Sequence, residues 1–363
     1  MSEEAFSLIF LFIVFGGSLC GAQECQFFNK EHLYVCEKII DQFPNAYYSN
    51  YNLKCRDCQI ENFKKDTFPY ENLLRSFNLS NSGIRYVGPN SFEQFKKLQY
   101  LDLRANNIQN ISVGAFKGLN ELFELHLQNN LLTQVGFLKG LSSNFVNLSG
   151  NLLESLPDSA FVGSVDIFGL DLSFNKIRKM HKDSFQDINE LETLDLSGNS
   201  LCHLPLGLFR SLNHLRSLNL AKNKLSRFNY GSFSGLKNLN FLNLSKNKLD
   251  FFDSTILLPM MHLTKLDLSG NGIWNFDLME LSLNVPSLRV ISIEDNLFSC
   301  TLLKTTLQYF KGKAIDVENN ISRYELLNIN GIACIEDYIS ESISLDYFLT
   351  KAKEQGEHLI QYC

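Results

Sequence analysis

The sequence contains no run of Lys or Arg, and its overall charge is acidic. It has 33 basic and 39 acidic residues, a formal net charge of −6 and an isoelectric point near 5.7. Nucleic acids and anionic membranes bind proteins that present clustered cations. The composition therefore disfavours nucleic acid or an anionic membrane surface as the main partner.

The sequence also lacks the motifs of common catalytic and metal sites. It contains no nucleophile motif and no phosphate-binding loop. Its seven histidines are scattered, and none sits in a metal-ligand motif. His126 follows Glu124 by two residues, which is commonplace for neighbours on an exposed strand. We predict that the chain is not an enzyme and needs no cofactor.

Long apolar runs are missing except near the N-terminus. Residues 5–15 are apolar, and Cys20 and Ala22 suit the positions before a cleavage site ahead of Gln23. The acidic Glu3 and Glu4 are unusual for a leader, so a membrane anchor is the alternative. The run is shorter than the ~20 residues that span a bilayer. We predict a signal peptide over 1–22 and a secreted protein with no membrane span after cleavage.

Nine cysteines occur, and most of those outside the leader cluster near the two ends of the chain. Such clusters are typical of disulfide-bonded caps in an oxidising compartment. We predict one bridge between Cys300 and Cys334. Two further bridges should join four N-terminal cysteines, for which three connectivities are open; these are Cys25, Cys36, Cys55 and Cys58. A redox or zinc role for the Cys55-x-x-Cys58 pair is the disfavoured alternative, because no second ligand pair lies at zinc spacing.

Two cysteines remain outside these clusters. Cys202 has no obvious partner in the sequence, and Cys363 ends a short C-terminal tail. An unpaired cysteine in a secreted protein suggests an intermolecular bond. We predict a disulfide-linked dimer or heterodimer through Cys363, with a free or internally paired thiol as the alternative.

A 24-residue repeat organises most of the chain. The segments LETLDLSGNSL (191–201), LRSLNLAKNKL (215–225), LNFLNLSKNKL (239–249) and LTKLDLSGNGI (263–273) share the template LxxLxLxxNxL. A period of this length indicates a solenoid, and the template resembles that of the leucine-rich repeat. We predict an α/β repeat horseshoe with a parallel concave sheet and disulfide-pinned caps.

Ten repeats follow one another with the asparagine position as a marker. The spacing is 24 except for 21 before Asn151 and 25 before Asn296. An amide offers two donors and an acceptor to backbone groups buried where the chain turns inward. We therefore expect a buried ladder of side chains, which comprises Ser82, Asn106, Asn130, Asn151, Asn175, Asn199, Asn223, Asn247, Asn271 and Asn296.

A phenylalanine recurs before most of the strands that follow. At one ring per turn, these residues should stack into a spine along the convex side; they are Phe92, Phe116, Phe161, Phe185, Phe209 and Phe233. The 21-residue repeat (131–151) is short on this side, so we expect an irregular convex segment there.

The sequence divides into five segments. We expect the leader over 1–22, an N-terminal cysteine cap over 23–60, the repeats over 61–298, a C-terminal cap over 299–337 and a tail over 338–363. The cap should contain a short helix within 298–312 and a strand or turn within 328–337. The tail has apolar residues at Ile339, Ile343, Tyr347 and Phe348, which is consistent with one amphipathic helix.

The concave face should carry the third, fifth and seventh template positions, because alternate side chains on a strand face the same way. Most of these positions are bland, including serines at the seventh; these are Ser149, Ser173, Ser197, Ser245 and Ser269. Repeats two and three differ, since they place mixed aromatic and charged groups on adjoining strands, as interfaces often do. The candidate binding residues are Tyr100, Asp102, Arg104, Glu124, His126 and Gln128. An ordinary solvated sheet face is the alternative. A weaker second patch comprises Asn219, Lys222, Lys246 and Lys265.

Five sequons are candidate glycosylation sites, at Asn78, Asn110, Asn147, Asn243 and Asn320. Asn78, Asn147 and Asn243 occupy the fifth position, so their glycans would project from the concave sheet. Phe145 and Phe241 stand two residues before two of them, as binding anchors or, in the interpretation we prefer, as rings over which the sugars stack. Glycans would then leave the patch of repeats two and three, or the rims, for protein recognition.

Residues 53–334 resemble the typical-class extracellular leucine-rich-repeat proteins, a group that includes Toll-type receptor ectodomains. The C-terminal DNLFSC and NINGIACIED resemble the cap of secreted insect leucine-rich-repeat proteins, including the leucine-rich immune proteins of mosquitoes. The resemblance implies soluble recognition of an extracellular protein or a microbial surface in innate immunity. A developmental or matrix binding module that handles a growth factor or a receptor is the alternative.

Overall fold

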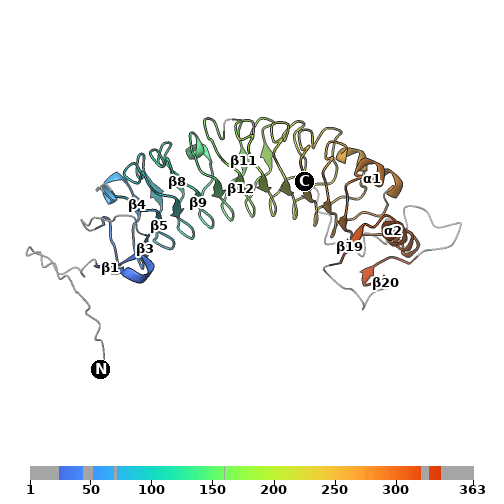
Figure 1. Cartoon of the computed structure of the whole chain (residues 1–363), viewed down its shortest axis with the longest axis horizontal. Coiled ribbons are helices and arrows are strands. Elements are labelled where there is room, and N and C mark those ends of the chain that lie inside the picture. Colours follow the sequence, from blue (N-terminus) through green and yellow to red (C-terminus); the bar gives the residue numbers. More distant parts are fainter. Residues whose placement is uncertain are drawn as a thin grey trace, which may run out of the picture.

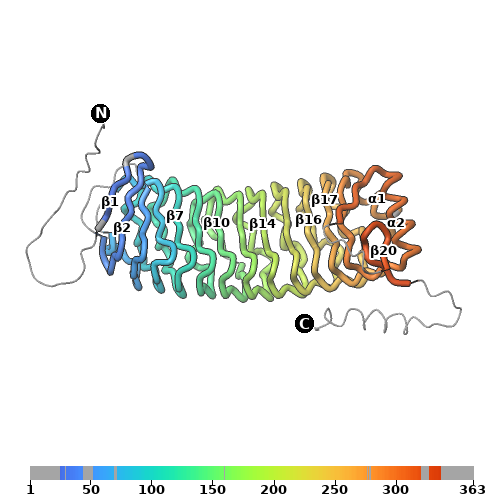
Figure 2. Tube along the Cα trace, turned by 90° about the horizontal axis from the view of Figure 1, so that it is seen from below, coloured from blue at the N-terminus to red at the C-terminus, as the bar shows by residue number. Residues whose placement is uncertain are grey.

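The computed structural model describes residues 24–43, 52–68, 72–158, 160–275, 277–319 and 327–336. The repeats stack side by side into an arch, with the main strands along its inner, concave side (Figure 1). Seen from below, successive turns of the chain run parallel from one end of the stack to the other (Figure 2). The predicted leader, the tail with Cys363, and Asn320 lie outside the described residues.

One continuous sheet lines the concave side. Within the described residues it has 14 strands, in the order β1-β2-β3-β5-β7-β9-β10-β12-β14-β15-β16-β17-β18-β19. All neighbours are parallel except the antiparallel pair β1 and β2. The bounds are β1 Glu24–Phe28, β2 Leu33–Glu37, β3 Asn52–Arg56, β5 Ser76–Asn78, β7 Tyr100–Asp102, β9 Glu124–His126, β10 Phe145–Asn147, β12 Gly169–Asp171, β14 Thr193–Asp195, β15 Ser217–Asn219, β16 Phe241–Asn243, β17 Lys265–Asp267, β18 Val290–Ser292 and β19 Asp316–Glu318.

Short elements form the rest of each turn. The small strands are β4 Asn62–Phe63, β6 Tyr86–Val87, β8 Asn110–Ile111, β11 Ser155–Leu156, β13 Lys179–Met180, β20 Asn328–Ile329 and β21 Ile332–Ala333. The 3-10 turns are η1 Asn29–Glu31, η2 Lys65–Thr67, η3 Gly136–Leu138 and η4 Ser254–Leu257, and the helices are α1 Leu278–Asn284 and α2 Cys300–Gly312. The predicted α/β repeat solenoid with a parallel concave sheet is confirmed.

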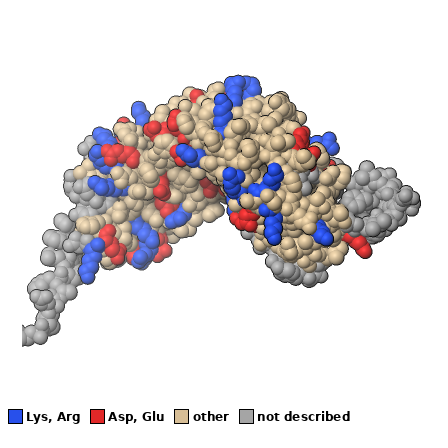
Figure 3. Space-filling view, turned by 45° about the vertical axis from the view of Figure 1, so that its right-hand side comes forward, with Lys and Arg blue, Asp and Glu red and all other residues tan. Residues whose placement is uncertain are grey.

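Charged side chains of both signs are spread over the outer surface. On the face shown in Figure 3, Lys and Arg lie close to Asp and Glu in small groups, with wide uncharged areas between them. Exposed ion pairs link turns, as between Arg85 and Glu61 at 2.9 Å. Mixed signs of this kind create no extended field for a polyanion.

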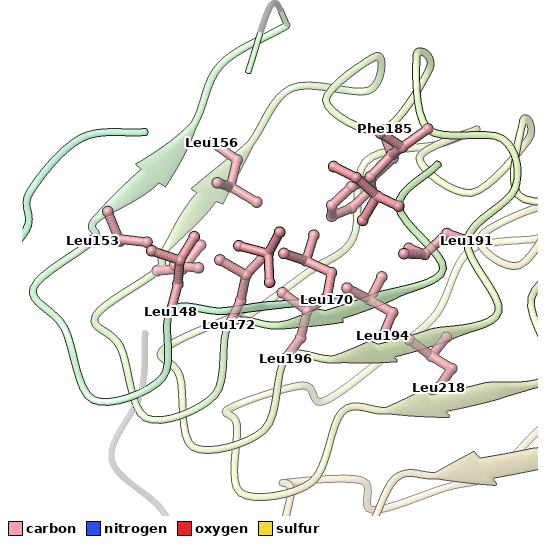
Figure 4. Packing of buried hydrophobic residues seen from close by; sticks show 14 of the residues in the cluster. Leu148, Leu153, Leu156, Leu170, Leu172, Phe185, Leu191, Leu194, Leu196 and Leu218 are labelled. Atoms are coloured by element: carbon pink, nitrogen blue, oxygen red, sulfur yellow. The ribbon is translucent and has the colours of Figure 1, made fainter. Parts of the chain in front are cut away.

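The leucines of the template fill the interior. Leu170, Leu194 and Leu218 lie at the centres of β12, β14 and β15, and each is paired in register with its neighbour. Figure 4 shows these side chains pointing into the same interior as Leu156 and Phe185. All five are almost completely removed from solvent. Because each turn buries its leucines against the turns beside it, stability depends on stacking rather than on a central core.

The predicted asparagine ladder is present. The Asn175 amide donates to the carbonyls of Leu172 in its own turn and Leu148 in the preceding turn, at 3.1 and 3.0 Å. Its Oδ1 accepts the Leu153 amide at 3.1 Å. The asparagines of all nine equivalent turns are buried, namely Asn106, Asn130, Asn151, Asn175, Asn199, Asn223, Asn247, Asn271 and Asn296. Each side chain therefore satisfies backbone groups of two turns at once.

The predicted phenylalanine spine is also present, and it begins one turn earlier, at Phe63. Phe63 and Phe92 stack at 4.8 Å, and the later rings Phe185, Phe209 and Phe233 stack at 6.4 and 6.2 Å. The short repeat interrupts this pattern. There η3 carries Phe137, whose ring meets Phe116 edge-on at 71°. The missing three residues thus produce the irregular convex segment that the spacing predicts.

Both ends of the stack are held by disulfides. At the N-terminal end Cys25 bonds Cys36 and Cys55 bonds Cys58, which resolves the open connectivity. At the C-terminal end Cys300, the first residue of α2, bonds Cys334, as predicted. The expected cap helix and the following strands, β20 and β21, are present. The strand β19, which extends the main sheet past the last repeat, was not anticipated, because its Asp-Val-Glu sequence does not match the template.

One cysteine differs from the sequence interpretation. Cys202, for which no partner was evident, is disulfide-bonded. It is partly buried and follows Leu201, where the chain leaves the ladder and starts back along one flank of the stack.

Candidate functional site

The six candidate binding residues lie together on the concave face. They come from β7, β9 and the residue two after each strand, and the register pairs Tyr100 with Glu124 and Asp102 with His126. Tyr100 and Arg104 are exposed, and the other four are partly exposed. We call this set the concave patch: Tyr100, Asp102, Arg104, Glu124, His126 and Gln128.

Four side chains of the concave patch are paired with one another. The Arg104 side chain meets the Asp102 carboxylate at 3.0 Å, and the backbone amide of Arg104 donates to the same carboxylate at 3.1 Å. The His126 Nε2 lies 2.8 Å from Glu124 Oε2. These contacts fix the side chains before any ligand arrives, which lowers the entropy that binding must overcome.

An aromatic edge adjoins the concave patch. Tyr100, Phe123, Phe145 and Phe168 lie at the starts of β7, β9, β10 and β12, and we call these four residues the aromatic edge. Tyr100 is 41% exposed and Phe123 is 47% exposed, with their ring centroids 6.0 Å apart. Phe123 and Phe168 escaped the sequence interpretation because they occupy the second template position, just before each strand, which the alternation rule does not assign to the concave face.

Phe145 is held in place by a glycine. A β-carbon at Gly169 would lie 2.5 Å from the Phe145 ring, so only glycine lets the ring rest over β12. On its other side the ring faces His126, with centroids 6.2 Å apart. Phe145 is therefore half-buried among protein groups. The predicted stacking of sugar on this ring stays a prediction.

The seventh-position serines correct one expectation. Ser173, Ser197, Ser245 and Ser269 were expected on the concave surface, but they are buried. A local turn also fixes these serines. In the repeat of Asn243, for example, Oδ1 accepts the Ser245 amide at 2.9 Å and the Ser245 hydroxyl at 2.7 Å. Ser149 makes the same turn with Asn147 but is partly exposed, so the turn alone does not bury the serine.

The same turn occurs in the concave sequons. Asn78 and Asn147 each accept two bonds from the serine two residues on, which is also the hydroxyl residue of the sequon. Both asparagines are partly exposed. They lie on β5 and β10, the strands directly beside the concave patch. Asn110, on β8, is exposed. Glycosylation of these residues stays a prediction, and glycans at Asn78 and Asn147 would border the patch on both sides.

The weaker second patch is more tightly paired than the sequence indicates. The Asn219 amide donates to Asp195 at 2.9 Å. Lys222 lies over the Phe174 ring at 5.4 Å. Lys265 pairs with Glu318 of β19 at 2.6 Å and lies 5.9 Å from the Phe241 ring. These contacts already use much of the patch, so it is a poorer candidate for binding.

The described part of the chain shows no cluster of metal-ligating side chains. In the same residues the longest helix, α2, has 13 residues, and no helix has the length and apolar character needed to cross a bilayer. The geometry that is present defines a class: a stack of short parallel strands, one per turn, sealed by disulfides and presenting a concave face.

Comparison with known proteins agrees with this class. A model of the leucine rich repeat family matches residues 51–108, 72–132, 98–143, 145–201 and 190–249, and a second such model matches 260–275. The chain therefore belongs to the leucine-rich repeat family.

Curated relatives match parts of the repeat array. Tsukushi-A of Xenopus laevis is 35% identical over 140 residues, or 36% of each chain. Lumican of Gallus gallus is 33% identical over 129 residues, which are 35% of this chain and 37% of lumican. Toll-like receptor 3 of Bos taurus is 26% identical over 167 residues, or 42% of this chain and 18% of the receptor. The chain thus spans little more than a third of the first two relatives and less of the third.

Solved structures share the fold. One is the complex of Latrophilin 3, Unc5D and FLRT2, where the matched chain has a TM-score of 0.63 at 20% identity, with 85% of this chain and 94% of that one covered. Another is the Toll–Spatzle complex, described as a hub in Drosophila development and innate immunity. Its TM-score is 0.53 at 20% identity, over 74% of this chain and 44% of that one. At this identity the likeness concerns the fold alone.

Proposed function

We propose that the chain is a secreted binding protein that recognises an extracellular protein ligand through the concave patch and the aromatic edge. The observation that supports this most is the row of four aromatic rings at the starts of four successive strands, beside charged groups that are already held in place. Exposed rings on a rigid sheet are unusual for a surface that only faces solvent, because interfaces are enriched in aromatic residues and arginine.

The expected division of binding energy follows from this arrangement. Tyr100 and Phe123 offer apolar area with few rotatable bonds, so a partner pocket that covers them gains affinity at low entropic cost. Asp102, Arg104 and Glu124 are already paired with neighbouring groups. They contribute orientation and selectivity more than affinity.

An extracellular location is supported by the disulfides. Three bridges join described cysteines, and a fourth involves Cys202. Such a number is typical of proteins that fold in an oxidising compartment. Together with the leader predicted over 1–22, this supports secretion.

The nature of the ligand is the less constrained part of the proposal. Two structures of the same fold contain protein partners by their titles, Spatzle with Toll, and Unc5D and Latrophilin 3 with FLRT2. We favour a protein ligand, with a microbial surface as the other candidate. We place the chain first in innate immunity and second among developmental or matrix binding proteins. In each case it binds rather than catalyses, without a cofactor and without nucleic acid. A dimer linked through Cys363 stays a sequence prediction.

Affinity capture from extracellular fluid tests the proposed surface. The bait is the purified full chain, compared with a Tyr100→Ala, Phe123→Ala double variant. We expect the variant to lose most of the captured protein, since aromatic hot spots are worth about 2 kcal/mol or more each. Tyr230→Ala is the matched control, because Tyr230 is 80% exposed and lies outside the patch. Equal capture by the double variant and the wild type would refute the proposed surface.

The two biological roles are separated by a different measurement. Expression that rises on infection, together with capture of circulating immune proteins, supports the role in defence. Constant expression, with capture of a growth factor or receptor, supports the developmental role.

Intact-mass analysis of the secreted chain tests the glycan hypothesis, which loses its basis if Asn147 and Asn243 are unmodified.

A further inference from the structure

Successive turns also meet outside the main sheet, where the chain passes from the ladder toward the convex side. In the turns of β10 and β12 this seam is closed, because β11 and β13 pair in register. The 24-residue repeat places residues 227–228 and 251–252 at the equivalent positions of later turns. Within the described residues no backbone hydrogen bond joins residues 226–228 to residues 250–252. The seam is therefore open between the turns of β15 and β16.

The side chains at the seam change along the stack. The fourteenth template position holds Leu156 and Met180 in the closed part, and Phe228 and Phe252 in the open part. Phe228 packs against Phe233 of the spine, with ring centroids 4.9 Å apart. The open seam thus coincides with a change from aliphatic to aromatic residues.

A cavity of about 410 Å³ lies at the open seam. Its apolar lining consists of Ile256 and four aromatic residues, Phe228, Phe251, Phe252 and Trp274. Phe252 is buried, Trp274 is partly exposed and Phe251 is 53% exposed, so ring surface is accessible from solvent. Small-molecule sites are typically cavities of about 300–1,000 Å³ with a mostly apolar lining and a few polar groups. The cavity at the seam has this character, and we call it the aromatic cavity.

Three charged side chains complete the lining of the aromatic cavity. They are Arg227, Asp250 and Asp253, and all three are exposed. The Asp253 Oδ1 accepts the Thr255 amide at 2.9 Å, which holds the carboxylate in place. Two carboxylates against one guanidinium leave a formal excess of one negative charge, so the local potential favours a cation over an anion.

Elsewhere in the chain an aromatic ring holds one of the protein's own cations. The Lys222 Nζ lies 5.4 Å from the centroid of the Phe174 ring, a distance at which the ring attracts an ammonium group. In the part of the chain that the structure describes, no Lys or Arg lies over Phe251 or Trp274 in this way. These two rings are therefore available to a cation from outside, and tryptophan offers the strongest attraction of the aromatic side chains.

We propose that the aromatic cavity binds an alkylated ammonium group, such as the trimethylammonium group of choline. The methyl groups pack against Phe251 and Trp274, and the carboxylates of Asp250 and Asp253 balance the charge. Such a cation has no N–H group, so it gives up no hydrogen bond to water when it enters an aromatic site. No residue that lines the cavity belongs to the concave patch or the aromatic edge, so this binding is independent of the proposed function.

Fluorescence tests the proposal, because Trp274 is the only tryptophan in the chain. The purified full chain is titrated with choline chloride, with sodium chloride adjusted to keep the ionic strength constant. We expect a saturable change in Trp274 emission. The uncharged carbon analogue of choline, in which a tert-butyl group replaces the trimethylammonium group, should give no saturable change over the same concentrations. No response to choline, or the same affinity for the analogue, would overturn the proposal.

The ammonium group can come from a free molecule or from a lipid headgroup. Vesicles of phosphatidylcholine are therefore added in a separate arm, with choline chloride as the competitor. A change in Trp274 emission that choline reverses supports a headgroup ligand, and a response to choline alone supports a free one. A response to vesicles that choline does not reverse counts against binding in the aromatic cavity.

Two single substitutions locate the site. Phe251→Ala removes an exposed ring and should weaken choline binding about 2- to 30-fold. Asp250→Asn removes one carboxylate charge and should weaken it about two- to fivefold. Phe174→Ala and Asp166→Asn are the matched controls, because both residues are exposed and lie outside the cavity. Saturation-transfer NMR on the choline methyl protons measures these affinities without relying on tryptophan emission. Wild-type affinity in both cavity variants would show that choline binds elsewhere.

Discussion

Two rows of Asp and Asn side chains run along the stack, four template positions apart, and they behave in opposite ways. The ninth-position asparagines are buried and bond backbone groups of two turns. The fifth-position residues lie on the concave face and bond mainly within their own turn. The first row holds neighbouring turns together, whereas the second shapes the surface locally. The structural role of an Asp or Asn in the repeat therefore depends on which backbone groups its side chain contacts.

The largest expected effect concerns the phenylalanine spine, which is buried like the asparagine ladder. Phe185→Ala removes a fully buried ring that stacks on Phe161 and Phe209. We expect a loss of about 3–5 kcal/mol in the free energy of unfolding, from lost transfer energy and the cavity left behind. Chemical denaturation measures it, with Tyr230→Ala as the exposed control. A loss as small as that of the control would show that the spine is not a structural element.

A substitution in the ninth-position ladder should cost more stability than one in the fifth-position row on the concave face, which we call the concave row. Asn175→Ala leaves the Leu148 and Leu172 carbonyls without their donor, and we expect a loss of roughly 1–3 kcal/mol. Asn175→Asp keeps the shape but removes the amide donors and buries a charge, so it should cost at least as much. Thermal unfolding measures both variants. If their unfolding midpoints equalled that of the wild type, the ninth-position row would not hold neighbouring turns together.

The concave row should tolerate the reverse exchange. Asp171 Oδ1 accepts the Ser173 amide at 2.9 Å. Asp171→Asn keeps this acceptor and should be close to neutral, while Asp171→Ala should cost about 0.5–1.5 kcal/mol. Denaturation midpoints of the two Asp171 variants measure these losses. Comparison with the two Asn175 variants shows whether the ladder is the more sensitive row. A large loss for Asp171→Asn would mean that the row also holds turns together.

The smallest effect concerns a lysine beside the ladder. The Lys248 Nζ is buried without a hydrogen-bond partner among the described residues. Burial lowers the pKa of Lys248, and the nearby charge of Lys224 lowers it further. The unfolded state therefore binds a proton more readily, so this residue destabilises the fold at neutral pH. That penalty fades as pH rises from the lowered pKa toward the ordinary value near 10.5.

Lys248→Met should accordingly raise stability at pH 7 by less than about 1 kcal/mol. The gain should shrink as the pH approaches 10. Denaturation at pH 7 and pH 10 measures it, and Lys237→Met at an exposed position is the control. A gain that grows with pH has the wrong sign for this explanation.

The features that repeat are the ones that the sequence predicts most completely. The ladder and the spine could be predicted because the same residue recurs at the same offset and must therefore make the same contact. The exposure of Phe123 and Phe168 could not be predicted. Both occupy the second template position, just before a strand, where the alternation of side chains along the strand does not apply. The repeat template placed the six patch residues on adjoining strands, and the register of β7 and β9 confirms that they lie together.

The most direct test measures partner capture by two variants at a temperature where both are folded. The account predicts that Asn175→Ala, although less stable, captures its partner like the wild type. The Tyr100→Ala, Phe123→Ala variant should be stable and should fail to capture. Loss of capture in proportion to stability, in both variants alike, would contradict the claim that buried rows build the stack and the concave face binds.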